Sequence, residues 1–486
     1  MTTWTSLVDE ARVAALSLID AATGAYDPTI RLGVTGLSRS GKTVFITALV
    51  QALTRGGRLP VFQAMNEGRI IGAQLSPQPD DTVPRFEIEA HLADLTGADR
   101  RWPSSTRQIS ELRLSIAFQS ERRFSGSRST LTLDIVDYPG EWLLDLPLLS
   151  KTYADWSAET IAASQGGTRA VLAAEWRAHL STLTASAPAD EEAARTAARL
   201  FTAYLKAGRE DRFALSILPP GRFLMPGDLE GSPALTFAPL DLSPGETARA
   251  GSLHAMMERR YEAYKNRVIR PFFTDHFARL DRQIVLVDAL TAFNAGPQAV
   301  KDLEAALASV LSAFRVGANS WISSLFRPRI EKILFAATKA DHLHHESHDR
   351  LEAILRRLAD RAIDRARYAG AAVDVVALAS IRATREATVR QGRKTLPCII
   401  GTPMAGEASP TETFDGTAEI AVFPGELPQD PDTIFSEGFT GLEAGSGGGA
   451  DYRFIRFRPP LASPTEPLPH IRLDRALEFL IGDRLA

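Results

Sequence analysis

The chain has 486 residues, of which 44% are apolar and 23% are charged. These fractions are close to globular averages, which excludes disorder as the default state, and the net charge of −4 gives no support to a nucleic-acid binder, whose contact face is basic. The length exceeds the roughly 250–300 residues at which a single core stops growing, so we expect one main domain with large insertions or a satellite.

The cysteine content and the N-terminus predict the compartment. Cys398 is the only cysteine, which rules out an intrachain disulfide and a cysteine-based zinc cluster and fits a reducing environment. Segment 1–25 lacks the basic-then-apolar order of a signal peptide and has apolar residues at helical spacing, so we expect an amphipathic helix there. No apolar run reaches the roughly 18–20 residues that span a bilayer. We therefore expect a cytoplasmic protein without a transmembrane segment, either free or peripheral at the inner membrane.

Short apolar runs that alternate with helical patterns predict an α/β fold. Near-continuous apolar runs are typical of parallel strands that are covered on both faces, and the helices between them indicate right-handed crossovers. The expected strands are 31–35, 131–137, 283–288, 333–337 and 373–378. The expected helices are 42–54, 299–314 and 347–368. A further run at 112–120 is expected to pair with 130–137 as an antiparallel hairpin at the sheet edge.

The rest of the chain departs from that alternation. The block from 143 to 280 is mostly helical, with patterns at 157–183, 189–207 and 246–280, and we expect it to be an inserted subdomain. The C-terminal part adds expected strands at 397–401, 418–423 and 452–458, a flexible loop at 441–451 and a closing helix at 473–485. We therefore divide the chain into a core (1–142 and 281–390), the helical insertion (143–280) and a β-rich C-terminal extension (391–486).

The strongest motif is Gly36-Leu37-Ser38-Arg39-Ser40-Gly41-Lys42-Thr43, which matches the Walker A pattern between a strand and a helix. In such a loop the glycines let backbone N–H groups surround phosphates, and the helix N-terminus adds its positive dipole end. Lys42 is expected to reach the β- and γ-phosphates, and the Thr43 hydroxyl to coordinate Mg²⁺. The expected nucleotide contacts in this segment are Ser38, Arg39, Ser40, Gly41, Lys42, Thr43 and Val44.

Asp137-Tyr138-Pro139-Gly140 ends the strand run LTLDIVD. A carboxylate at this end of a strand beside the phosphate loop can hold Mg²⁺ through water, and Gly140 can bring its backbone N–H to a γ-phosphate. Release of that phosphate relaxes the loop, which is the usual basis of a nucleotide switch. The first switch needs a hydroxyl shortly before the hairpin to close over the metal ion and the γ-phosphate. Thr106 is our candidate, and Ser105 competes with it.

Two later segments indicate that the base is guanine. Thr338-Lys339-Ala340-Asp341 follows a strand, and the Asp341 carboxylate can accept from both N1–H and the exocyclic amine of guanine, whereas adenine offers no such donor pair. Lys339 would lie along the base plane. Ser380 and Ile381 follow the last strand, where a backbone N–H would contact guanine O6, although a plain strand end is the alternative.

Together these segments resemble the YcjX family of bacterial P-loop GTP-binding stress proteins. The resemblance covers nearly the whole chain and is carried by GLSRSGKTVFITAL, DYPGEWLLDLPLL, YEAYKNRVIRPFFTDHF, VLVDALTAFNAG, TKADHLHHESH, ALASIRAT and HIRLDRALEFLIGDRL. It implies a P-loop NTPase with a Ras-like GTPase core and a helical insertion, bound GTP or GDP with Mg²⁺, and a role in envelope stress and the phage-shock response. An unidentified protein effector, such as an envelope-stress component, is the partner that this implies.

Two substitutions indicate slow hydrolysis. Glu141 stands where Ras-like GTPases place the water-orienting glutamine, and its carboxylate would repel a γ-phosphate unless it is protonated or paired, although it could act as a base. Arg39 replaces a glycine and is either an internal arginine finger or, in the simpler interpretation, solvated or paired with an acidic neighbour. The catalytic candidates are thus Lys42, Thr106, Gly140 and Glu141, and the metal ligands Thr43, Thr106 and Asp137.

Other interpretations stay open. The nucleotide could be a structural ligand of a stress scaffold that never turns over, or the chain could be an ATP-dependent enzyme, for which no acceptor site with a catalytic base is evident. Asp288 and Asn294 either brace the switch loops or form a plain turn. Four histidines crowd one segment (His342, His344, His345 and His348), and a solvated or helix-capping cluster is favoured over a metal site.

Overall fold

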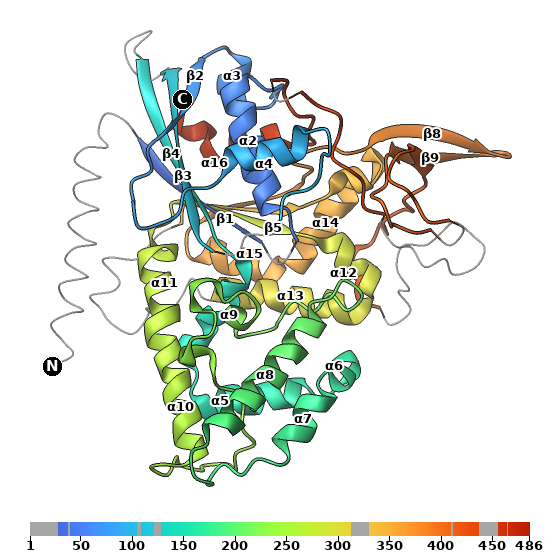
Figure 1. Ribbon diagram of the computed structural model, residues 1–486. Helices are drawn as coiled ribbons and strands as arrows, with labels where there is room; N and C mark the ends of the chain where they lie inside the picture. Colours follow the sequence, from blue (N-terminus) through green and yellow to red (C-terminus); the bar gives the residue numbers. More distant parts are fainter. Residues whose placement is uncertain are drawn as a thin grey trace.

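A computed structural model shows an α/β core above a separate group of helices (Figure 1). The structure describes residues 28–36, 39–104, 108–120, 128–312, 330–409, 412–436, 455–463 and 465–486. The expected N-terminal helix, the loop at 441–451 and the start of the strand expected at 452–458 lie outside these ranges.

Within the described residues, seven strands form the central sheet in the order β2-β3-β4-β1-β5-β6-β7. The strands are β1 (Thr29–Gly36), β2 (Ile70–Ser76), β3 (Ser110–Gln119), β4 (Arg128–Asp137), β5 (Arg282–Val287), β6 (Lys332–Ala337) and β7 (Ala372–Ala377). β1 lies between β4 and β5 and is parallel to both, and β5, β6 and β7 continue the parallel part. β3 and β4 form the expected antiparallel hairpin. The predicted α/β fold with a mostly parallel sheet is confirmed.

Helices cover both faces of the sheet, as the apolar strands predict. Alternate residues of β5 enter two different clusters, Ile284 and Leu286 on one face and Val285 and Val287 on the other. This follows from the two-residue repeat of a strand. The first face is covered by α2 (Lys42–Arg55), α4 (Ile88–Thr96) and α16 (Leu473–Ile481), and the second by α12 (Ala289–Ala295), α13 (Pro297–Ser312), α14 (His348–Leu358) and α15 (Asp360–Tyr368).

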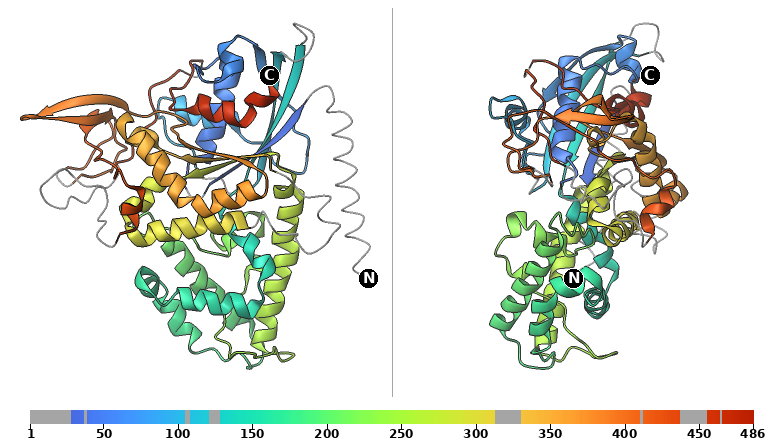
Figure 2. Two further views of the ribbon diagram at one scale, coloured as in Figure 1. Left: turned by 180° about the vertical axis from the view of Figure 1, so that it is seen from behind. Right: turned by 90° about the vertical axis from the view of Figure 1, so that its right-hand side faces the viewer.

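The helical block at 143–280 has an aromatic centre of its own. Its elements are α5 (Tyr153–Ala163), α6 (Gly167–Leu172), α7 (Ala174–Leu180), α8 (Glu191–Gly208), α9 (Gly221–Leu224), α10 (Leu253–Tyr264), the π-helical turn Lys265–Ile269 and α11 (Arg270–Asp275). Trp156 stacks on Tyr261 at 5.1 Å between ring centroids, and Phe237 meets both rings edge-on. These helices lie together below the core in Figures 1 and 2.

The block meets the core around a buried tyrosine. The ring of Tyr138, directly after β4, packs edge-on against Phe272 of α11 and Phe277, and its hydroxyl accepts a hydrogen bond of 3.1 Å from Gln283 of β5. Burial raises the pKa of Tyr138 well above its ordinary value, so the hydroxyl stays neutral. The same apolar cluster therefore runs from the sheet into the block.

The structure differs from the expectations in several elements. The hairpin does not form the sheet edge, because β2 pairs antiparallel with β3 outside it. Sequence reasoning missed β2 since most of its side chains are exposed or half-buried and give no apolar pattern. The helix expected at 347–368 breaks at Ala359, and the one expected at 246–280 begins only at Leu253.

The C-terminal part is divided between the core and a projecting sheet. β8 (Arg385–Gln391), β9 (Lys394–Gly401) and β10 (Ile420–Val422) form an antiparallel sheet that extends away from the body in Figure 2. The closing helix α16 instead shares an apolar cluster with β1 and α2. The remaining short helices are α3 (Gln63–Asn66) and the 3-10 turns Gly140–Ser150, Gly227–Leu229, Pro233–Leu235, Phe277–Arg279, Ala340–His342, His345–Ser347, Pro431–Phe435 and Gly482–Arg484. In the part of the chain that the structure describes, no helix has the length and apolar character needed to cross a membrane.

Candidate functional site

The phosphate loop joins the end of β1 to the start of α2. Gly41, the residue before α2, has a left-handed backbone with φ of 86° and open space where a side chain would stand. This conformation favours glycine and turns the chain into the helix. The Lys42 ammonium donates to the Gly36 carbonyl oxygen at 3.0 Å and is 8% exposed, so the lysine spans the mouth of the loop. Ser38 lies outside the described residues.

The segment after β4 touches the phosphate loop through two glycines. A Cβ atom built on Gly140 would stand 2.1 Å from the Gly36 carbonyl oxygen, and one built on Gly36 would stand 2.2 Å from the Ser40 hydroxyl. No side chain fits at either position without moving backbone. Gly140 therefore holds its segment directly against the start of the phosphate loop.

Glu141 is paired. Its side chain is 5% exposed, and its Oε1 lies 2.8 Å from Nη2 of Arg209, which follows α8 of the helical block. A carboxylate is tolerated beside a phosphate if it is protonated or paired, and the structure shows that Glu141 is paired. The pairing residue comes from the block rather than from the core.

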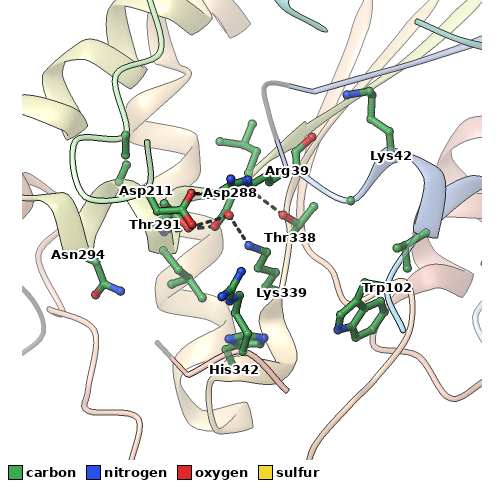
Figure 3. A pocket seen from close by; sticks show the side chains of 18 of the residues that line it. Arg39, Lys42, Trp102, Asp211, Asp288, Thr291, Asn294, Thr338, Lys339 and His342 are labelled. Carbon is green, nitrogen blue, oxygen red and sulfur yellow. Dashed lines mark hydrogen bonds and ion pairs between the residues drawn. The ribbon is translucent and has the colours of Figure 1, made fainter. Parts of the chain in front are cut away.

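Arg39 also contacts the helical block. Its guanidinium forms an ion pair with Asp211, and both side chains are more than half exposed. Figure 3 shows this pair at one side of the cavity, with Lys42 apart from it. The structure thus matches the interpretation of Arg39 as paired with an acidic neighbour.

Lys339, in the segment after β6, pairs with the carboxylate that ends β5. Lys339 has φ of 61°, and its ammonium donates to Oδ2 of Asp288 (Figure 3). Asp288 also accepts from the backbone N–H and the hydroxyl of Thr291, at 3.2 and 2.8 Å, and so caps α12. Burial opposes ionisation, but the Lys339 charge and these hydrogen bonds outweigh it and lower the pKa of Asp288. Asp288 therefore fixes the lysine.

Backbone hydrogen bonds fix the two predicted base-binding segments. Asp341 is 5% exposed, and its Oδ2 accepts from the Ala383 N–H at 2.8 Å. Ala379 exchanges two hydrogen bonds with Ile471, at 3.1 and 2.8 Å, next to the buried Ser380. The C-terminal segment before α16 thus supports a loop that the sequence division assigned to the core.

One cavity of about 920 Å³ joins these segments. The predicted residues that line it are Arg39, Ser40, Gly41, Lys42, Thr43, Val44, Glu141, Thr338, Lys339, Asp341, Ser380 and Ile381. Asp137 and Gly140 are not among the residues that line the cavity. Asp137 is in register with Val34 of β1. Thr106 and Ser105 lie outside the described residues, but Trp102, Pro103 and Ser104 before them line the cavity.

Several lining residues were not expected from the sequence. Arg209 and Asp211 come from the helical block, and Phe457 from the C-terminal part, where its carbonyl oxygen accepts from Nε1 of Trp102 at 2.6 Å. No spacing in the sequence links them to the phosphate loop, because tertiary packing alone brings them there. The only signal is the polar run Arg209-Glu210-Asp211-Arg212 directly after an amphipathic helix.

The histidine cluster is divided by burial. His348 bonds the Ala340 carbonyl oxygen at 2.9 Å, and burial lowers the pKa of this histidine and of His342, which meets Phe457 edge-on. His344 is buried, whereas His345 is exposed and pairs with Glu386 at 2.8 Å. Most of these contacts brace the loop after Asp341.

The oxygen donors around the phosphate loop fit a hard divalent cation. Thr43 offers a hydroxyl in the first turn of α2, and Asp137 offers a carboxylate that is 1% exposed at the end of the neighbouring strand. Hydroxyl and carboxylate oxygens with water are the ligands that Mg²⁺ prefers. Asp137 is not among the residues that line the cavity, which suits contact through water rather than direct ligation.

Comparison with known proteins assigns the chain to a family. The family model described as "YcjX-like family, DUF463" matches residues 30–485. A curated protein of Escherichia coli (strain K12) named Ras-like GTPase YcjX is 41% identical over 472 residues, which cover 94% of this chain and 96% of that protein. A protein of the same name from Shewanella oneidensis is 34% identical over 493 residues, covering 94% and 95%. The mostly parallel sheet with its phosphate loop agrees with a Ras-like P-loop fold, and the chain belongs to the YcjX-like family.

Proposed function

We propose that this chain binds GTP and GDP with Mg²⁺ and hydrolyses GTP slowly as a molecular switch. One observation carries the proposal: the phosphate loop and both predicted base-binding segments, far apart in the sequence, line the same cavity. The names of the two curated relatives support it. An ATP-dependent enzyme would have no use for the carboxylate of Asp341 in this place, because adenine lacks the donor pair that it would accept from.

The phosphates would be held by the segment that begins α2. Ser38, Arg39, Ser40, Gly41 and Val44 would contribute backbone N–H groups, and Lys42, at the positive end of the α2 dipole, supplies a buried positive charge. Lys42 would exchange part of its bond to Gly36 for phosphate oxygens. Thr43, Thr106 and, through water, Asp137 would hold Mg²⁺, which supplies positive charge to the β- and γ-phosphates.

The base would lie against Lys339 and Thr338, with its N1–H and exocyclic amine donating to Asp341. Asp288 supports this arrangement because its carboxylate fixes the Lys339 ammonium. The backbone of Ser380 and Ile381, anchored through Ala379 to the C-terminal segment, would donate to guanine O6. Guanine specificity then follows from matched hydrogen bonds.

Hydrolysis would place a water molecule beside Glu141 and the Gly140 N–H. The water oxygen forms a bond to the γ-phosphorus, the bond from that phosphorus to the bridging oxygen breaks, and GDP leaves with the electron pair. The proton of the water passes to the released phosphate. Slow turnover follows because Glu141 replaces the water-orienting glutamine of Ras-like GTPases and Arg39, paired with Asp211, does not act as an arginine finger.

Nucleotide state would reach a partner through the helical block. The Gly140–Ser150 turn is buried against it, since a Cβ on Gly221 would stand 2.1 Å from the Glu141 carbonyl oxygen and Asp145 accepts from the Gly221 N–H at 2.6 Å. Movement of Gly140 with the γ-phosphate therefore moves the block. We propose a protein effector of envelope stress as the receiver, with the chain in the cytoplasm or peripheral at the inner membrane.

Titration with fluorescent GTP, ATP and XTP tests the base assignment. Wild type should prefer GTP over ATP by at least about 100-fold, the scale of a mismatched hydrogen-bonded pair. In Asp341→Asn the carbonyl oxygen should stay on the Ala383 N–H and the amide NH₂ should face the base, so XTP, with an acceptor in place of the guanine amine, should gain affinity as GTP loses it. Lys42→Ala should lose all three nucleotides. Equal affinity of wild type for GTP and ATP would refute guanine selectivity, and single-turnover phosphate release separates a slow enzyme from a scaffold without turnover.

A further inference from the structure

Arg209 is a residue of the helical block whose side chain reaches the predicted reaction centre. It follows α8, which spans Glu191–Gly208, and is 22% exposed in its side chain. Its Nη2 lies 2.8 Å from Oε1 of Glu141, and its Nη1 contacts the Met225 sulfur at 3.2 Å. Both Arg209 and Glu141 line the cavity that Lys42 and Thr43 enter.

The block also fixes the backbone of Glu141. A Cβ on Gly221 would stand 2.1 Å from the Glu141 carbonyl oxygen and 3.1 Å from the Trp142 nitrogen, so the two chains are in direct backbone contact. Arg222 places its guanidinium 3.3 Å from the centroid of the Trp142 ring. Residues of the helical block therefore pair with the Glu141 carboxylate and also fix the main chain at this position.

The Glu141 carboxylate needs the Arg209 cation because it is a buried charge near the predicted phosphate site. A buried carboxylate beside a triphosphate is repelled by it, and a buried charge without a partner is costly. The Arg209 guanidinium cancels that charge at 2.8 Å, although the contact is not aligned as a hydrogen bond, which leaves Oε1 able to accept from a further donor such as water. Without the helical block, the core would lack the Arg209 cation.

We propose that Arg209 is a positioning residue for GTP hydrolysis, acting through Glu141. It holds the Glu141 carboxylate at the γ-phosphate end of the cavity and neutralises it, so that a water can be oriented there without expelling GTP. This inference rests on the proposed function. It makes the helical block a part of the reaction centre as well as a receiver of nucleotide state.

The first test compares GTP with GDP. Arg209→Met keeps the apolar stem near Met225 but removes the charge, so the exposed anion of Glu141 should weaken GTP about tenfold or more and leave GDP, which lacks the γ-phosphate, within about twofold. A residue needed only for packing would affect both nucleotides equally. Single-turnover hydrolysis should fall about 10- to 100-fold, and Arg209→Lys should restore part of the GTP affinity.

A double-mutant cycle with Glu141→Gln isolates the charge. If Arg209 acts by cancelling the carboxylate, Arg209→Met should cost little GTP affinity in a Glu141→Gln background. Arg195→Met is the matched control, because Arg195 of α8 pairs with Glu191 at the surface and does not line the cavity.

The outcomes separate the two proposals. Additive effects in the cycle, or equal losses of GTP and GDP, would overturn the role of Arg209 while leaving guanine-nucleotide binding intact. If the wild-type protein bound neither GTP nor GDP, the proposed function itself would fail.

Discussion

The two ends of the cavity are built in different ways. The phosphate end, comprising residues 39–43 with Gly140 and Glu141, is joined to the helical block by the ion pairs Arg39–Asp211 and Arg209–Glu141. The base end, comprising residues 338–341 and 379–381, is held by backbone hydrogen bonds to Ala383 and Ile471. Ion pairs to the helical block therefore hold one end, whereas the other is held by bonds from main-chain donors and by the Lys339–Asp288 pair within the core.

This difference suits the proposed switch. A nucleotide brings negative charge to the phosphate end, where it competes with Asp211 and Glu141 for arginines, so this end can change its partners when the γ-phosphate is lost. The contacts at the predicted base end involve no residue of the phosphate loop or of the helical block, so loss of the γ-phosphate should leave them intact. Changes that alter charge or close packing at the phosphate end should therefore disturb nucleotide binding more than similar changes elsewhere in the chain.

The largest effect is expected from Gly140→Ala. Its Cβ would stand 2.1 Å from the Gly36 carbonyl oxygen, so the segment after β4 must move away from the phosphate loop. Such overpacking costs about 1–3 kcal/mol, and 3 kcal/mol taken wholly from the bound state would weaken GTP about 100-fold. Isothermal titration with GTP and GDP measures the loss.

Gly72→Ala is the matched control for this change. A Cβ on Gly72 of β2 meets no atom within 4 Å, so nucleotide affinity should stay at the wild-type value. If Gly140→Ala also bound GTP like wild type, the two segments would have to separate without cost, and the close contact would have no part in binding.

Asp145 offers an intermediate effect that depends on pH. Burial raises the pKa of Asp145 to about 6, against hydrogen bonds from Tyr264 and Gly221 that lower it. A carboxyl with a raised folded-state pKa favours the native state in its protonated form, so its contribution declines as pH rises from about 4 to about 6 and is constant above that. Between pH 4.5 and 7.5 this decline amounts to about 2 kcal/mol.

Asp145→Asn should remove that decline, and Tyr264→Phe should enlarge it. The asparagine cannot ionise, whereas loss of the Tyr264 hydroxyl removes a donor to Oδ2 of the carboxylate and raises the pKa of Asp145 further. Urea denaturation at a series of pH values, compared with wild type, gives the differences directly. Shifts of the same sign in both variants would contradict this assignment of the ionising group.

The sequence predicted the base end better than the surroundings of the phosphate end. Strands β1, β4, β5, β6 and β7 are short apolar runs, and a parallel sheet brings their carboxyl ends to one edge, so motifs that follow them can be placed without further knowledge. Helical patterns at 157–183, 189–207 and 246–280 likewise predicted the inserted block. Arg209 and Asp211 could not be found in this way, because their approach depends on how the block packs on the core, and helical periodicity does not encode it.

Local exposure explains the other differences. β2 has no apolar repeat, since it is bound to β3 mainly by its backbone and leaves Ile71 and Leu75 partly exposed. The closing helix α16 was expected with the C-terminal strands, but its strongly one-sided apolar face, including Leu473, Leu477 and Leu480, packs with the core. Its amphipathic pattern predicted that one face would be buried, and only the fold shows that this face packs with β1 and α2.

The smallest effect is expected at the pair Arg39–Asp211. Both side chains are more than half exposed, and exposed ion pairs contribute about 0.2–1 kcal/mol, so Arg39→Ala should change GTP affinity by less than about fivefold. Asp211→Ala should raise GTP affinity slightly, because it frees a guanidinium beside the phosphates. Screening should make both effects shrink between low and high salt.

The rate of hydrolysis decides whether this pair is only a surface contact. If Arg39 stays with Asp211 throughout the reaction, Arg39→Ala should leave the single-turnover rate within a few-fold of wild type, and the double variant Arg39→Ala/Asp211→Ala should equal the single one. A fall of about 10³-fold would mean that Arg39 leaves Asp211 and stabilises the transferring phosphoryl group as an internal arginine finger. In that case Asp211 would act as a restraint on catalysis, and Asp211→Ala alone should speed hydrolysis; a slow Arg39→Ala with an unchanged Asp211→Ala would instead show that Arg39 is released before the rate-limiting step.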